Sequence, residues 1–181
     1  KYLILAAIAG AIVTADQATK MYVHTHILEG EQIEVIKNFF NITHVHNAGA
    51  AFGFLADSHA LFREIFFLSM PPIALLIILA IFRGVAESDR WTICALSSVF
   101  GGAIGNYIDR LRFRYVIDFL DFTIVWDSTA IPPKSFVYPS FNIADIAIVC
   151  GVAVLLFIEF TRPREAVAVI DEKSAAKAET P

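Results

Sequence analysis

Four long apolar stretches divide the chain, at about residues 2–23, 60–82, 91–109 and 141–160. Each is close to the roughly 20 residues that an α-helix needs to cross a hydrocarbon layer about 30 Å thick. Polar residues interrupt the first three stretches, whereas the centre of the fourth is almost purely aliphatic. The pattern predicts an α-helical membrane protein with four transmembrane helices.

The start of the first stretch is also typical of a secretory signal peptide, since Lys1 precedes an apolar run that reaches small residues near Ala15. The helical pattern nevertheless continues through Asp16 and Lys20 to Val23, a length sufficient to span. Three further apolar stretches follow it. We therefore expect the first stretch to be a membrane helix of the mature protein.

The segments between and after the stretches have different patterns. Residues 31–47 alternate partly between apolar and polar positions and are rich in branched and aromatic residues, which predicts short strands in a small extracytoplasmic sheet. Residues 122–140 mix prolines and aromatics without helical periodicity, and we expect an extended loop at the outer face. The division predicts one membrane-embedded domain over 1–160 and a polar, disordered cytoplasmic tail over 161–181.

Loop charges indicate an orientation, because cytoplasmic loops carry an excess of Lys and Arg. Basic residues at the N-terminus, in the 83–90 loop and in the tail favour both termini in the cytoplasm, although the loop before the fourth stretch is also basic. This orientation places residues 24–59 and 110–140 on the outer side of the membrane.

Composition narrows the class of protein. The chain is 57% hydrophobic and 18% charged, and its mean hydropathy of +0.63 exceeds that of ordinary soluble domains. A net charge of −4 offers no broad basic surface, which excludes nucleic acid as a partner. Cys94 and Cys150 both lie in apolar stretches, so the sequence indicates neither a disulfide nor a zinc site.

Ionisable groups within membrane spans are costly, and each calls for a partner or a purpose. Asp16 and Lys20 are four residues apart and can form an ion pair on one helix face, which on its own would only fix a helix end. Asn106, Asp109 and Arg110 follow a stretch of small residues that allows close helix packing.

A second group of carboxylates lies near the outer interface. Asp118 and Asp121 follow the third stretch, and Asp145 comes about 6 Å into the fourth, on one helix face with Asn142. Two carboxylates in a partly dry site share a proton, so that one can activate water while the other polarises a carbonyl group. Capping of a helix N-terminus and an ion-conducting path remain alternatives at this point.

Other chemistries have weaker patterns. His24 with His26, and His44 with His46, form two H-x-H pairs that lack the carboxylate or cysteine ligands that would strengthen a metal site, so we expect no metal site. No G-x-S-x-G motif is present. A proton-coupled transporter would need ionisable residues at mid-membrane and an internal repeat, and the sequence has neither. A noncatalytic membrane scaffold would tolerate the loss of the carboxylates.

Five sequence blocks occur in order: DQATK at 16–20, HNAGAAFG at 46–53, GGAIGNYIDR at 101–110, VIDF at 116–119 and FNIAD at 141–145. Together they resemble the bacterial lipoprotein signal peptidase (signal peptidase II) family. The resemblance implies a four-helix aspartic endopeptidase of the bacterial inner membrane. Such an enzyme removes the signal peptide from diacylglyceryl-modified prolipoproteins by cutting before the lipidated cysteine. It implies no cofactor; prolipoprotein and membrane lipid are the expected partners, and we expect a monomer.

The resemblance also implies roles for single residues. Asp118 and Asp145 match the catalytic pair, and Asp121, expected one helical turn from Asp118, is the rival. Asp109 is expected to be structural, and Phe52 to pack against lipid, signal helix or core. The polar residues that match the family's supporting set are Asp16, Lys20, Asn47, Asn106, Arg110 and Asn142.

Two features depart from the family pattern. The stretch between Asp118 and Asn142 is longer than usual in the family, and the polar tail after residue 160 is extended. Neither touches the motif residues. The strand segment and the 122–140 loop are expected to form a cradle and a lid around the peptide.

Overall fold

The computed structural model describes residues 1–49, 59–127 and 134–161. These residues form four helices, α1 (Tyr2–His26), α2 (Ala60–Gly84), α3 (Arg90–Phe113) and α4 (Ile143–Thr161). They also form four strands, β1 (Gln32–Ile36), β2 (Phe40–Asn47), β3 (Val116–Asp127) and β4 (Lys134–Phe141). The expectations for Phe52, for the tail beyond 161 and for residues 128–133 of the expected 122–140 lid concern residues outside this description.

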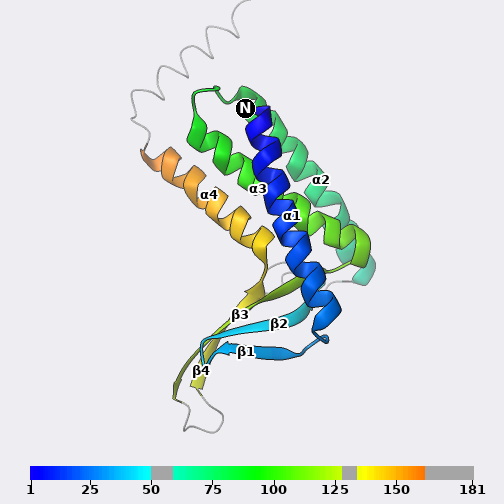
Figure 1. The fold of residues 1–181 in the computed structure, drawn as a ribbon. Helices are drawn as coiled ribbons and strands as arrows, with labels where there is room; N and C mark the ends of the chain where they lie inside the picture. Colours follow the sequence, from blue (N-terminus) through cyan, green and yellow to red (C-terminus); the bar gives the residue numbers. More distant parts are fainter. Residues whose placement is uncertain (50–58, 128–133, 162–181) are drawn as a thin grey trace, which may run out of the picture.

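The helices form a bundle with the sheet at one end (Figure 1). Helix α1 runs from the far end of the bundle down to the sheet, and α4 leads away from the sheet (Figure 1). Helix α3 packs against α1, α2 and α4 and is therefore the centre of the bundle. The four apolar stretches of the sequence thus correspond to four helices.

Among the described residues, three helical segments are long and apolar enough to cross a membrane: α1, the Glu64–Gly84 part of α2, and α4. Helix α3 is more polar, since its second half carries Asn106, Asp109 and two arginines. Large apolar side chains on α2 and α4, such as Leu76 and Phe157, are 67% and 68% exposed. A hydrocarbon surrounding accounts for such surfaces, which water disfavours.

Close helix packing depends on glycines of α3, as the small-residue stretch predicts. A Cβ atom placed on Gly101 would lie 2.8 Å from the Ala9 Cα of α1. A Cβ atom on Gly102 would collide with the backbone oxygen of Ala144 in α4. These glycines let α1 and α4 approach α3 to backbone contact. The contact of Gly102 with Ala144 also sets the position of the first turn of α4 along α3.

Gly102→Ala is therefore expected to lower the free energy of unfolding by about 1–3 kcal/mol, because the obstructing atom is backbone and cannot rotate away. It should also lower the rate of the chemistry proposed below, since α4 carries Asp145. Gly10→Ala is the matched control: a Cβ at this α1 position meets nothing within 4 Å, and alanine favours a helix by about 1 kcal/mol. Thermal unfolding in detergent measures both, and equal stability of the two variants would contradict this packing.

The sheet is antiparallel with strand order β1-β2-β3-β4. The expected strands over 31–47 are confirmed as β1 and β2. The expected loop over 122–140 is wrong, because its described residues continue β3 and form β4, which pair with each other. Strand β4 lies at the sheet edge, where Pro139 is tolerated, and residues 135–139 are all exposed. An edge strand with both faces exposed has no alternating pattern to reveal it.

Candidate active site

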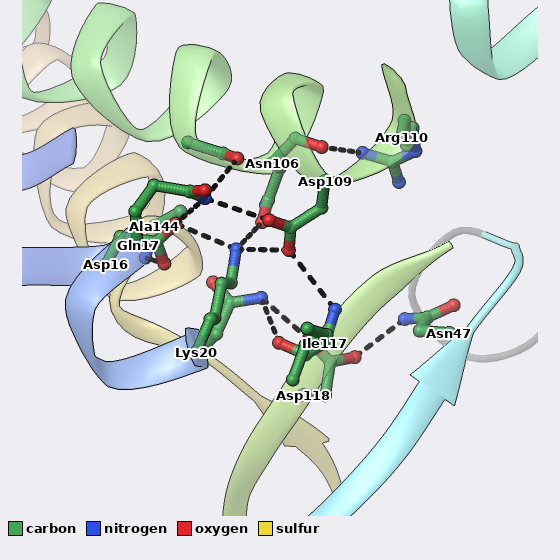
Figure 2. Close-up of polar contacts among 12 residues, drawn as sticks. Asp16, Gln17, Lys20, Asn47, Asn106, Asp109, Arg110, Ile117, Asp118 and Ala144 are labelled. Carbon is green, nitrogen blue, oxygen red and sulfur yellow. Dashed lines mark hydrogen bonds and ion pairs between the residues drawn. The ribbon is translucent and has the colours of Figure 1, made fainter. Parts of the chain in front are cut away.

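The site lies where the sheet meets the helix bundle. The last turns of α1 and α3, the end of β2 and the start of β3 contribute polar side chains (Figure 2). The first turn of α4 adds Asp145. The structure brings all eight residues expected from the sequence into one continuous network. Arg110 lies at its border and joins it by a 3.5 Å hydrogen bond to the Asn106 backbone oxygen. The other seven are Asp16, Lys20, Asn47, Asn106, Asp118, Asn142 and Asp145.

Asp145 takes part in a reciprocal cap at the start of α4. Its backbone N–H donates to the Asn142 side-chain oxygen at 3.0 Å, and the Asn142 N–H donates to Asp145 Oδ2 at 3.2 Å. This is the capping-box arrangement, with Asn and Asp in its two positions. The capping alternative is therefore confirmed, but it leaves Asp145 Oδ1 for another partner. Asn106 of α3 donates to that oxygen at 2.7 Å.

Asp118 of β3 is 2% exposed and accepts two amide hydrogen bonds. Asn47 of β2 donates to Oδ2 at 2.8 Å, and Asn142 donates to Oδ1 at 2.7 Å. Burial raises the pKa of Asp118 to about 7, which the Asn47 hydrogen bond opposes and the nearby Asp145 charge reinforces. Asp118 therefore holds a proton up to near-neutral pH.

Asn142 is the residue that joins the two carboxylates. It is fully buried; its side-chain amide contacts Asp118 and its backbone N–H contacts Asp145. Two carboxyl groups from a strand and a helix are thus held on one bridging residue. Asn142 therefore fixes the position of each carboxyl group relative to the other.

The buried ammonium group of Lys20 stabilises the surroundings of Asp118 and Asp145. Lys20 is 1% exposed, and its ammonium nitrogen lies 2.8 Å from Asp16 Oδ2 and 2.9 Å from Asp109 Oδ2. It also donates to the Asn106 oxygen at 2.9 Å, as Figure 2 shows. The expected ion pair of Asp16 and Lys20 is confirmed, and Asn106 connects it to Asp145.

The two carboxylates around Lys20 also hold backbone. Asp16 Oδ1 accepts the N–H of Ala144 in the first turn of α4 at 2.9 Å. Asp109 Oδ2 accepts the N–H of Ile117, next to Asp118, at 3.2 Å. Each catalytic candidate is therefore adjacent to a residue whose backbone is fastened to the Lys20 cluster. The structural role expected for Asp109 agrees with this contact.

Gln17 was not singled out from the sequence, although it lies in the first motif block. Its side-chain amide donates to Asp109 Oδ1 at 2.8 Å and to the Gly105 carbonyl at 3.1 Å. The signal that would have found it is a third polar residue on the same membrane helix as Asp16 and Lys20.

Arg110 lies at the border of the network. Its guanidinium donates to the Gly49 carbonyl at 3.4 Å and lies 5.1 Å from the centre of the Phe67 ring. The Gly49 contact holds the chain just after β2, the strand that ends at Asn47. Arg110 is thus placed to position the segment that follows the site residue of β2.

Asp121 is separate from the pair. The premise that it lies one helical turn from Asp118 is wrong, because 116–127 is a strand. Its carboxylate accepts from Gln32 at 2.8 Å and Asn41 at 2.9 Å and lines a polar pocket of about 510 Å³ on the sheet. That pocket includes neither Asp118 nor Asp145 in its lining.

The chain matches the family model described as signal peptidase (SPase) II over residues 8–161. It is 45% identical over 148 residues to a lipoprotein signal peptidase of Syntrophus aciditrophicus (strain SB), covering 82% of this chain and 86% of the relative. It is 41% identical over 150 residues to one of Geobacter sulfurreducens, covering 83% and 86%.

Two solved structures of bacterial membrane enzymes are also similar. One has a TM-score of 0.73 at 31% sequence identity, with 88% of this chain and 94% of that chain covered. The other has a TM-score of 0.70 at 30% identity, with 98% and 93% covered. The sequence relatives and the solved structures therefore each match more than four fifths of this chain.

Proposed function

The chain belongs to the signal peptidase II family, and from this premise we propose that it removes signal peptides from prolipoproteins with Asp118 and Asp145 as its catalytic pair. The observation that carries the assignment is the bridge at Asn142, which contacts both carboxyl groups. The substrate class follows the lipoprotein signal peptidases to which the chain is similar.

The geometry supports different roles for the two carboxyl groups. Asp118, whose pKa is raised to about 7, gives a hydrogen bond to the scissile carbonyl oxygen. Asp145 takes a proton from a water molecule, whose oxygen then bonds to the carbonyl carbon. As the tetrahedral intermediate collapses, the C–N bond breaks and the leaving nitrogen receives the proton held by Asp145. Asn47, Asn106 and Asn142 hold both groups in position throughout.

We place the cut before a cysteine that carries diacylglycerol, as the resemblance implies. A substrate held by a lipid moves in the membrane plane, so its cleavage site arrives at interface depth. Asp145 lies in the first turn of α4 and Asp118 near the start of β3. In Figure 1 the starts of these two elements lie where the helices meet the sheet. The same placement disfavours a transporter, whose ionisable groups would lie midway along the spans.

The proposal includes the membrane arrangement. Helix α3, enclosed by three apolar helices, is the fourth span, and residues 1–160 act as one domain in the bacterial inner membrane. Both termini lie in the cytoplasm and the sheet lies at the outer face, in agreement with the loop charges. We propose that the enzyme works as a monomer, as expected from the sequence.

The experiment that tests this function offers the purified, detergent-solubilised protein a diacylglyceryl-modified prolipoprotein beside the same precursor without lipid. We expect cleavage of the modified precursor at the bond before the cysteine and little cleavage of the other. An intact modified precursor under conditions where the protein is folded would overturn the function.

Cleavage is expected to fall as the pH rises through about 7, because Asp118 then loses the proton it must hold. The stability contribution has the same sign: a carboxyl group with a raised pKa favours the folded state at low pH and loses this contribution as the pH rises toward 7. A pH series of kcat/KM and of thermal unfolding measures both.

Asn47→Ala gives the control for this pH dependence. The Asn47 hydrogen bond lowers the pKa of Asp118, so its loss should move the alkaline limb of kcat/KM to higher pH. A rate that rises through pH 7, or a limb that Asn47→Ala leaves in place, would contradict the role of Asp118.

A further inference from the structure

Three histidines that are far apart in the sequence converge where α1 meets β2. His44 Nε2 lies 3.1 Å from His46 Nε2 and 3.4 Å from His24 Nδ1. One nitrogen from each ring lies within 4.8 Å of the other two. The cluster is outside the aspartate network, and it mixes the two H-x-H pairs that the sequence suggested, since His26 does not take part.

The outer nitrogens of two rings already have oxygen partners. His44 Nδ1 lies 2.8 Å from the Ile27 carbonyl oxygen, and His46 Nδ1 lies 2.9 Å from Glu29 Oε1. A carbonyl or carboxylate oxygen only accepts, so in both neutral rings Nδ1 carries the hydrogen. With this assignment both Nε2 atoms present lone pairs to each other at 3.1 Å, an arrangement that a metal ion or a proton between the two rings would satisfy.

The surroundings match those of a metal site. Metal-binding histidines commonly donate their second N–H to a carbonyl or carboxylate, which sets the tautomer and the ring orientation. Ile27 and Glu29 supply these two acceptors. The Tyr115 ring stacks on His46 with centroids 3.8 Å apart, and the Phe113 ring lies 5.0 Å from His24, so aromatic side chains limit the movement of both rings.

We propose that His24, His44 and His46 form a binding site for one divalent transition metal ion, with zinc as the best fit. Zinc–nitrogen bonds of about 2.0–2.1 Å in a tetrahedron place neighbouring nitrogens about 3.3 Å apart. The separations of 3.1 and 3.4 Å agree with that value, and only the third pair has to approach. Three imidazoles leave a fourth position for water.

The ion fastens the last turns of α1 to strand β2. The residue after His46 is Asn47, which donates to Asp118, so the metal stiffens the strand that presents this asparagine. It stands apart from the chemistry assigned to the aspartates. A metal chelator should therefore remove the ion while leaving the prolipoprotein cleavage of the aspartate pair in place.

The test uses the full chain in detergent, purified without a histidine tag and stripped of metal. Co²⁺ is titrated as a coloured probe and Zn²⁺ is added to displace it, with bound metal per chain measured by mass spectrometry. We expect one Co²⁺ per chain, with the absorption of a four- or five-coordinate site, and full displacement by Zn²⁺.

His26→Ala is the matched control, since His26 bonds to Tyr22 and Thr25 rather than to the cluster. It should bind Co²⁺ as the unmodified protein does. His44→Ala and His46→Ala should weaken binding by at least roughly 10–100-fold. Glu29→Gln, at a side chain that is 63% exposed and so safe for folding, should weaken it by roughly tenfold.

The outcomes separate the possibilities. Absence of stoichiometric Co²⁺ and Zn²⁺ in the unmodified protein overturns the site and leaves a shared proton between His44 and His46. Equal weakening by His26→Ala, or unchanged binding in Glu29→Gln and His46→Ala together, also overturns it. These readouts do not depend on cleavage, so a failure of the proposed peptidase function would leave the metal result unaffected.

Discussion

Asp118→Asn and Asp145→Asn are each expected to lower kcat/KM for a diacylglyceryl-modified prolipoprotein by roughly 10²–10⁴-fold or more, with the protein still folded. An amide cannot take a proton from water, and it cannot share one with the other carboxyl group. The substitution keeps the shape of the side chain. Because burial penalises the charge of Asp118, removing that charge should not lower the melting temperature in neutral solution.

Asp121→Asn is the matched control for this result. Asp121 lies in the same strand and is 5% exposed, close to the 2% of Asp118. Its partners are Gln32 and Asn41 rather than the residues of the pair. We expect Asp121→Asn to cut at nearly the unmodified rate, with or without a metal chelator. Unmodified rates in Asp118→Asn or Asp145→Asn would remove the aspartate pair.

The helices followed from hydrophobic pattern, while their ends depended on contacts that the pattern does not contain. The stretch over 91–109 became a helix over Arg90–Phe113, because polar residues after the apolar run remain helical when neighbouring elements bind their side chains. Arg114 caps the C-terminal end of this helix with a left-handed backbone, at a φ of 68°. Helix α4 begins at Ile143, after the Asn142 cap that the sequence pattern suggested.

The hairpin of β3 and β4 was the part of the fold that the sequence did not predict. Strand β3 owes its placement to pairing with β2, which is more than 60 residues earlier in the chain, and to the Asp109 bond at Ile117. Neither contact leaves a recognisable pattern in the sequence of the strand itself. The error moved Asp118 and Asp121 onto a helix, where they would have been neighbours.

The site residues were predictable as a set but not as a network. Motif blocks identified the polar residues, and four-residue spacing identified the contact between Lys20 and Asp16. Spacing says nothing of Asp109, which comes from α3 and makes the second ion pair. The histidine cluster has the same origin, because β2 returns to the end of α1 only in the folded chain.

Lys20→Met is expected to lower the free energy of unfolding by about 3–5 kcal/mol, the cost of breaking a buried ion pair from one side. Methionine keeps nearly the length of the lysine stem, so loss of packing contributes little. What remains is two carboxylates, Asp16 and Asp109, that are 0% and 1% exposed and have lost their cation. Denaturation in detergent at neutral pH measures the effect. Cleavage should fall as well, because Asp16 and Asp109 hold the backbone N–H groups of Ala144 and Ile117 beside the catalytic pair.

Two comparisons isolate the buried charge as the cause. Glu64→Gln removes an ion pair to Arg114 at 3.4 Å whose side chains are 47% and 57% exposed, and exposed pairs contribute at most about 1 kcal/mol. Adding Asp16→Asn to Lys20→Met should recover part of the lost stability, because one uncompensated carboxylate disappears while its oxygen still accepts the Ala144 N–H. Two outcomes would contradict a role for the Lys20 charge in holding the bundle to the sheet. One is a Lys20→Met variant that is no less stable than Glu64→Gln. The other is a double variant that is less stable than Lys20→Met alone.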